Sequence, residues 1–397
     1  MPQGDSILRS WLWDKALPWC VASLADRKLG GFNERFDWSG KPVDPGFKRI
    51  RVAGRQVYVM AHAALGGVAG AREVALEGVN YLVRYGLRPD GQFVSRLNSD
   101  GSVLESSTDL YDVAFGLFAM AWWYRLTNDP YPLEIASTAI SLLRTELFSP
   151  SGKGYRARAR ASVLHEQNPH MHLFEAAIFL TGFSGRVEFR QLADELFDLA
   201  ANCLFDSVTD TLPEFFDTEW RAGDERGRIS VEPGHHYEWV WLLNRYGELS
   251  GTTEAFQIAE RLFTFAQRHG HDPDTGLIFD AVGVHGEIQQ RDFRIWPNTE
   301  FLKAQIAMQE RHGKIDGFDD EAIEANITRI LKHFLSPQTN GPAKALGDGL
   351  WIDYLEGQSL TPKCDHVPAS TLYHIMFGFT EYLRFQSGHT AFSGLPW

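Results

Sequence analysis

The sequence has few cysteines and no long apolar run. Cys20, Cys203 and Cys364 lie far apart in a chain of 397 residues and form no CxxC pair. This excludes a disulfide-rich scaffold and is typical of unpaired thiols in a reducing compartment. The longest uncharged stretch near the hydrophobic maximum, 113–124, is shorter than the about 20 residues that a membrane-spanning helix needs. Charged residues also interrupt the first 15 positions, so no secretory signal is expected, and the sequence predicts a cytoplasmic protein.

Blocks of basic residues are missing as well. The chain carries 38 Lys and Arg against 51 Asp and Glu, a net charge of −13, and no Lys/Arg cluster that could follow a nucleic-acid backbone. The GxxxxGK[ST] and GxSxG motifs are absent, and the glycines at 66–70 follow no strand. A nucleic-acid partner, a membrane partner and a nucleotide cofactor are therefore not expected.

What the sequence does contain is helical periodicity. Apolar residues recur at spacings of three and four over most of the chain, whereas strict alternation is confined to short pieces such as 92–97. The pattern predicts twelve helices, at 6–25, 51–68, 70–86, 108–127, 131–147, 168–183, 186–204, 232–250, 253–270, 296–312, 316–334 and 366–386.

The connections between these helices alternate in length. Short turns rich in Gly, Asn, Asp, Pro and Ser are typical of antiparallel neighbours. The long connections are 26–50, 87–107, 148–167, 205–231, 271–295 and 335–365, and in a series of helical hairpins all of them emerge at one end. Six hairpins of this kind predict an all-α (α/α)6 barrel as a single domain over 1–397, with long loops and short β-hairpins at one end. An open solenoid is the alternative.

Polar residues with chemically useful side chains stand near the start of every second helix. Because those helix starts converge in a closed ring, we expect them to line one pocket. The residues that mark the six starts are Arg55, Tyr111, His172, His235, Trp296 and His374.

The sharpest local motif is EPGHHYEW at 232–239. Proline and glycine begin a helix and place His235 in its first turn, where the helix dipole disfavours imidazolium, so a neutral His235 is expected. Glu238 lies one turn further and could orient this ring or hold a substrate hydroxyl. The alternative is a helix-capping pair at a solvated rim.

A second motif, NPHMHLFEA at 168–176, repeats this arrangement. Pro169 opens the helix directly after Asn168, and His172 and Glu175 are again three residues apart. Histidines with a nearby glutamate can also bind zinc, but no HExxH sequence follows. We therefore predict neither a metal nor any other cofactor.

These motifs together resemble the N-acylglucosamine 2-epimerase superfamily. The other segments that carry the resemblance are GGF at 30–32, the Arg55-Gln56 pair, DLYDVAF at 109–115, RIWP at 294–297 and Tyr373-His374. The PGHxxEW form at 233–239 is similar to the D-mannose isomerase and aldose–ketose isomerase branch. The resemblance implies an (α/α)6 barrel that interconverts free sugars without a metal.

In that branch the reaction would interconvert D-mannose and D-fructose, and also D-lyxose and D-xylulose, through a cis-enediol. The resemblance implies that His235 and His374 transfer the protons and that Arg55 and His172 donate hydrogen bonds to the developing oxyanion. The remaining expected substrate-binding residues are Tyr111, Asn168, Glu238 and Trp296.

Other functions stay open from the sequence. The same residues could serve an aldose 2-epimerase acting on mannose and glucose or on acylated glucosamine and mannosamine. A glycoside hydrolase or lyase would use carboxylates such as Asp109, Glu238 and Asp365, and a non-catalytic sugar-binding protein is the third possibility. The expected partner is a monosaccharide, and the protein is expected to be a monomer or a homodimer.

Overall fold

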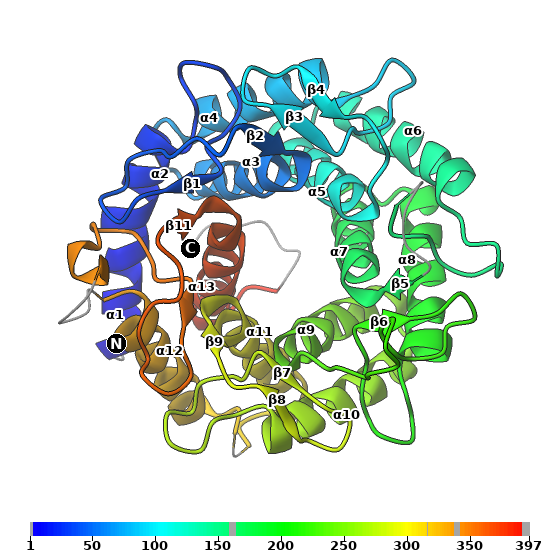
Figure 1. Ribbon diagram of the computed structural model, residues 1–397, viewed down its shortest axis with the longest axis vertical. Coiled ribbons are helices and arrows are strands. Elements are labelled where there is room, and N and C mark those ends of the chain that lie inside the picture. Colours follow the sequence, from blue (N-terminus) through cyan, green and yellow to red (C-terminus); the bar gives the residue numbers. More distant parts are fainter. Residues whose placement is uncertain (1–2, 159–163, 316, 337–341, 391–397) are drawn as a thin grey trace.

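The computed structural model describes residues 3–158, 164–315, 317–336 and 342–390, and its helices form two concentric rings (Figure 1). Each inner helix contacts the next, and α13 contacts α3, so that the ring is closed. This confirms the predicted (α/α)6 barrel and excludes the open solenoid. The inner helices are α3 (Ile50–Leu65), α5 (Leu110–Thr127), α7 (Gln167–Ser184), α9 (Pro233–Ser250), α11 (Ile295–His312) and α13 (Leu372–Gln386).

The outer helices pack on the inner ring from outside. They are the continuous α1 (Gln3–Arg9), η1 (Ser10–Ala16) and α2 (Leu17–Ser23), then α4 (Ala71–Tyr81) with η2 (Leu82–Gly86), α6 (Tyr131–Glu146), α8 (Val187–Leu199) with η3 (Ala200–Leu204), α10 (Thr253–His269) and α12 (Asp320–Phe334). An outer helix such as α10 buries one stripe, whereas α5 is buried on nearly every side because it has neighbours all round. Within the described ranges, no helix is long and apolar enough to cross a membrane.

All twelve predicted helices are present, with two starts displaced. The segment predicted at 366–386 becomes α13 only at Leu372, after a short 3-10 helix η5 (Ala369–Thr371), because β11 (Val367–Pro368) pairs with β1 (Arg35–Phe36). The helix predicted at 316–334 begins at Asp320, where the Asp319 carboxylate caps the Ala322 N–H; residue 316 itself lies outside the described residues.

Short antiparallel strands join the long loops at one end of the barrel. Because strands from different loops pair with each other, the loops form one layer there (Figure 1). Short strands were predicted at this end as hairpins, but among the described residues only the loops 87–107 and 271–295 contain a hairpin, and the other pairings join different loops. Ribbons of only two or three short strands are not stable alone and need support from the helices beneath them. The remaining pairings are β3 (Arg96–Asn98) with both β2 (Phe47–Arg49) and β4 (Val103–Glu105), β5 (His165–Glu166) with β6 (Phe215–Phe216), β7 (Ala281–Val282) with β8 (Ile288–Gln290), and β9 (Phe293–Arg294) with β10 (Tyr354–Leu355).

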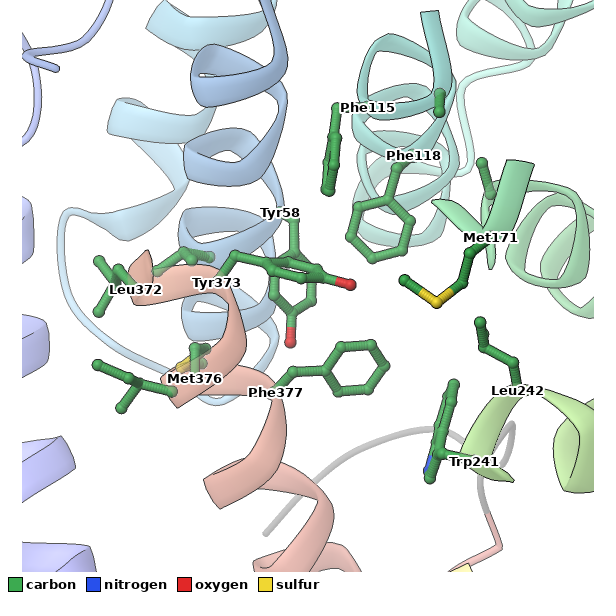
Figure 2. Packing of buried hydrophobic residues seen from close by; sticks show 14 of the residues in the cluster. Tyr58, Phe115, Phe118, Met171, Trp241, Leu242, Leu372, Tyr373, Met376 and Phe377 are labelled. Atoms are coloured by element: carbon green, nitrogen blue, oxygen red, sulfur yellow. The ribbon is translucent and has the colours of Figure 1, made fainter. Parts of the chain in front are cut away.

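Aromatic side chains fill the centre of the ring. Tyr58 of α3 packs on Phe118 of α5 and on Phe377 of α13, with ring centres 5.1 and 5.5 Å apart, and Trp241 of α9 completes the cluster (Figure 2). The barrel is therefore a packed core and not a channel, so that a site at the loop end has a closed floor.

Close packing of α3 against α5 depends on Gly54. A Cβ built at this position would lie 2.3 Å from the Phe115 carbonyl oxygen, which belongs to backbone and cannot move aside. Gly54→Ala is expected to lower the free energy of unfolding by about 1–3 kcal/mol, measured by urea denaturation. Gly86→Ala is the control, because its nearest contacts are the ends of the flexible Ile50 and Leu82 side chains. Equal stability of the two variants would contradict this account of the helix contact.

Candidate active site

A cavity of about 230 Å³ opens at the loop end of the barrel. All eight residues that the sequence pointed to contribute to its wall, as predicted from the convergence of the inner-helix starts. The complete lining is Arg55, Tyr111, Asn168, His172, Glu232, His235, Glu238, Arg294, Trp296, Asp353, Ser370, Thr371 and His374.

Capping groups and prolines at the helix N-termini determine where these side chains lie. The Asp109 carboxylate caps α5 by accepting hydrogen bonds from the backbone N–H groups of Tyr111 and Asp112, which fixes Tyr111 in the first turn. Pro233 occupies the first turn of α9, where its missing N–H costs nothing, and His235 follows directly.

The three histidines of the pocket share one arrangement. In each, Nδ1 lies at hydrogen-bond distance from a glutamate oxygen, and because an ionised carboxylate can only accept, Nδ1 donates. This leaves the second ring nitrogen, Nε2, to interact with a ligand. The pairs are His172 with Glu175 at 3.1 Å, His235 with Glu214 at 2.9 Å and His374 with Glu300 at 2.8 Å.

His235 is held in its protonated form. Burial lowers the pKa of this imidazole, but the Glu214 and Glu232 carboxylates outweigh burial and raise the pKa to about 9. The prediction of a neutral His235 was wrong, because it weighed the helix dipole alone. Glu214 comes from the long connection 205–231, and nothing in the sequence pattern marks it as a neighbour of α9.

The pKa of His374 is shifted in the opposite direction. Burial lowers its pKa to about 4, and the Arg55 and Lys303 cations act in the same direction, against the single Glu300 carboxylate. This ring is therefore neutral near pH 7. Glu300 also escaped the sequence analysis, although it lies one turn after Trp296 on α11, a spacing that places two residues on the same helix face.

Trp296 contacts both of these histidines. Its ring centre lies 4.9 Å from that of His235 and 5.4 Å from that of His374. The two imidazoles therefore reach one small cavity from two different helices, α9 and α13. This brings together an acid and a base whose pKa values differ in the direction that acid–base catalysis needs.

Arg55 supplies a cation on the α3 side of the cavity. Its guanidinium donates to the Tyr111 hydroxyl over 2.8 Å and lies 4.1 Å from the centre of the Phe115 ring. Tyr111 in turn stacks on His172, with ring centres 5.1 Å apart. Because the described residues offer no hydrogen-bond partner to the Arg55 Nε, this cation keeps part of its bonding capacity for a ligand.

Glu238 and Asn168 bring unpaired polar atoms into the pocket. Neither oxygen of the buried Glu238 carboxylate, nor the Asn168 Oδ1, has a hydrogen-bond partner among the described residues. Burial, reinforced by the neighbouring Glu300, raises the pKa of Glu238 well above its usual value. Of the two roles that the sequence left open for Glu238, the structure does not support orienting His235, because Glu214 holds that ring and Glu238 lies 3.7 Å from the His172 Nδ1. Its burial rules out a capping pair at a solvated rim.

The carboxylates required by the hydrolase hypothesis do not come together. Of the three, only Glu238 lines the cavity. Asp109 caps α5 and pairs with Arg51 and Arg158, and the exposed Asp365 bonds to the neighbouring His366. No pair of these side chains can therefore flank a glycosidic bond in this pocket.

Three groups of side chains within the described ranges have the spacing of metal ligands. A histidine binds a metal only through a deprotonated ring nitrogen, and a glutamate binds it only as an ionised carboxylate. In two of the groups a positive charge competes with a cation: the Glu214 and Glu232 carboxylates raise the pKa of His235, and the Lys303 ammonium lies 2.7 Å from Glu300. The groups are His172, Glu175 and Glu238; Glu214, Glu232 and His235; and Glu238, Glu300 and His374.

Comparison with known proteins agrees with this geometry. The family model for N-acylglucosamine 2-epimerase (GlcNAc 2-epimerase) matches residues 30–378. The mannose-6-phosphate isomerase of Rhizobium meliloti (strain 1021) is 34% identical over 384 residues, 94% of this chain and 95% of the relative. The D-mannose isomerase of Thermobifida fusca is 25% identical over 316 residues, 74% of this chain and 76% of the relative.

Solved structures show the same fold. The crystal structure of a D-mannose isomerase superposes with a TM-score of 0.84 at 20% identity, covering 97% of this chain and 99% of that one. The chain belongs to the N-acylglucosamine 2-epimerase family and is a sugar isomerase or epimerase.

Proposed function

We propose that this protein is an aldose–ketose isomerase that interconverts D-mannose and D-fructose, and by the same chemistry D-lyxose and D-xylulose. The observation that carries the proposal is the pair His235 and His374, which share one small pocket and whose surroundings move their pKa values apart, to about 9 and about 4. Such a pair provides an acid and a base at the same pH. The D-mannose isomerases among the relatives support the choice of sugar, whereas the relative that is 34% identical is named for mannose 6-phosphate.

The proposed reaction begins at the open-chain aldose. The neutral His374 takes the C2 proton at Nε2 while the protonated His235 gives its Nε2 proton to the carbonyl oxygen O1, which forms a cis-enediol. Arg55 donates to the oxygen on which negative charge develops, because imidazole cannot remove so weakly acidic a proton unless that charge is stabilised.

The second half of the reaction restores both histidines. His374 returns its proton to C1, and the O2 hydroxyl proton passes to His235, which leaves a C2 ketone. Asn168 and Glu238 hold sugar hydroxyls through their unpaired atoms, and the Tyr111 and Trp296 rings shape the pocket. Burial lowers the pKa of His172, so its ring is neutral; because Nδ1 already donates to Glu175, Nε2 accepts from a sugar hydroxyl and is not the donor that the resemblance implied.

The cavity favours a single unphosphorylated sugar. Its volume of about 230 Å³ is below the about 300–1,000 Å³ of pockets for larger ligands. Glu232, Glu238 and Asp353 make the wall rich in carboxyl groups, and Arg294 is already paired with Asp280 and Glu232. A phosphate would meet these acids without a free arginine beside Arg55, so we expect mannose to be preferred over mannose 6-phosphate.

The test is to incubate chelator-treated protein with D-mannose in deuterated water and to follow the products by NMR. We expect fructose, with deuterium at C1 in the fraction of turnovers in which the proton on His374 exchanges with solvent before it is returned. Glucose with deuterium at C2 would identify a 2-epimerase instead, a result in keeping with the 24% identity over 313 residues to a cellobiose 2-epimerase of Bacteroides fragilis. Activity that disappears with the chelator and returns with a metal would contradict the metal-free mechanism. Mannose 6-phosphate, run in parallel, tests the choice of substrate.

A further inference from the structure

A completely buried lysine lies on the inner helix α11, behind the histidine that we propose as the base. The Lys303 ammonium group is 2.7 Å from Glu300 Oε2, one helical turn away, and 4.0 Å from the centre of the Phe377 ring. A buried cation is costly unless a carboxylate compensates it, and a carboxyl group from each of two other inner helices, Glu238 of α9 and Glu175 of α7, also faces this lysine.

The lysine continues a chain of contacts that ends in the pocket. Glu300 uses its two oxygens for different partners: Oε2 faces the Lys303 ammonium, and Oε1 accepts from His374 Nδ1 at 2.8 Å. All three side chains are buried, and only His374 lines the cavity. Lys303 therefore acts on the pocket through Glu300 and touches no substrate.

A comparison of the two histidine–glutamate pairs shows what this lysine adds. Apart from His235, the Glu214 carboxylate accepts hydrogen bonds from the Gln167 side-chain amide and the Glu232 backbone N–H, both uncharged, and the Glu232 carboxylate lies 3.7 Å from His235 as a second anion. Glu300 has a full positive charge at the corresponding place. The two pairs thus have the same geometry at the imidazole but differ in the charge behind the carboxylate.

We propose that Lys303 is a positioning residue for the isomerase reaction. Its charge keeps Glu300 ionised, so Glu300 accepts a hydrogen bond from His374 Nδ1 and fixes the tautomer of the ring. The same charge prevents the ring from taking up a second proton. Without the lysine, the Glu300 carboxylate would act on His374 without the opposing charge from α11, and the pair would take up a proton at a higher pH than in the wild type, which weakens the base.

The charges around His374 agree with this role. Two cations face the ring, Arg55 from α3 and Lys303 from α11, together with His172 from α7, and the Glu300 carboxylate opposes them. The Glu238 carboxyl group of α9 also lies within 4.8 Å, but burial and the neighbouring Glu300 raise its pKa and so favour its neutral form. Burial raises the pKa of Glu300, but Lys303 and His374 outweigh burial and lower it. The Lys303 charge favours both a neutral His374 and an ionised Glu300. Removal of Lys303 therefore raises the proton affinity of both members of the pair, and the two effects add.

The test compares Lys303→Met, which keeps the length of the side chain without its charge, with Lys303→Gln, which also keeps a hydrogen-bond donor. Lys48→Met is the matched control, because Lys48 is likewise buried and paired with a carboxylate, Asp26 at 2.8 Å, but does not line the pocket. In both Lys303 variants, the acidic limb of the kcat/KM profile is expected to move to higher pH by about 1–3 units, whereas Lys48→Met leaves it in place.

This inference rests on the proposed function, and a second measurement separates the two. The imidazole signal of His374, identified by its absence in His374→Asn, is titrated by NMR in the wild type and in the variants, which needs no turnover. A shift of this titration to higher pH in Lys303→Met or Lys303→Gln supports the role of the lysine even if no sugar is converted. If the variants fold and the titration and the acidic limb both stay in place, the proposal fails, whatever the loss in kcat.

Discussion

Replacing His374 by asparagine is expected to lower kcat by about 10²–10⁴, the range that general acid–base groups contribute, with little change in stability. The reason is geometric: His374 is the neutral imidazole of the pocket, and its Nδ1 is already held by Glu300. His235→Asn is expected to cause a loss in the same range, because it removes the acid that protonates the carbonyl oxygen. Steady-state assays with mannose, together with circular dichroism of each variant, measure both effects.

The control for these variants is His312→Asn, since His312 lies near the end of α11, pairs with Glu260 and does not line the cavity. It should retain wild-type kcat. Retained turnover in both His374→Asn and His235→Asn would refute the assignment of the acid–base pair. A loss confined to one of them would leave that residue as the only histidine on which the proton transfer depends.

Substitution of Glu214 by glutamine should change the pH dependence at the alkaline end. The Glu214 and Glu232 carboxylates raise the His235 pKa to about 9 against the opposing effect of burial, so the acid form persists up to that pH in the wild type. Without the Glu214 charge the pKa falls, and the alkaline limb of kcat/KM is expected to move to lower pH by about 1–3 units. At pH 8 this corresponds to a loss of about two- to ninetyfold, depending on the size of the shift, whereas at pH 6 the loss is at most about twofold.

Glu219→Gln tests whether any charge on the same loop has this effect, because Glu219 is exposed and does not line the cavity. Its profile should match that of the wild type. An equal loss for Glu214→Gln at every pH, with an unchanged alkaline limb, would mean that Glu214 orients the ring but does not keep it protonated.

The secondary structure and the series of helical hairpins are local properties that the sequence carries by itself, whereas closure of the ring depends on the contact of α13 with α3. Apolar spacing gives the helices, and the alternation of short and long connections gives the hairpins and places all long loops at one end. The eight pocket residues could be predicted for the same reason: each lies near the start of an inner helix, and in a closed ring those starts must converge. The short strand β11 was missed because its partner β1 lies more than 300 residues away.

The electrostatics of the pocket depend on contacts between distant segments, which only the tertiary structure decides. Glu214 reaches His235 from a loop, Glu300 reaches His374 from another helix, and Lys303 lies behind Glu300. The sequence placed two similar histidines at two helix starts. Because the charge of a buried imidazole is set by the carboxylates and cations within a few ångströms of it, the folded structure alone makes one of them an acid and the other a base.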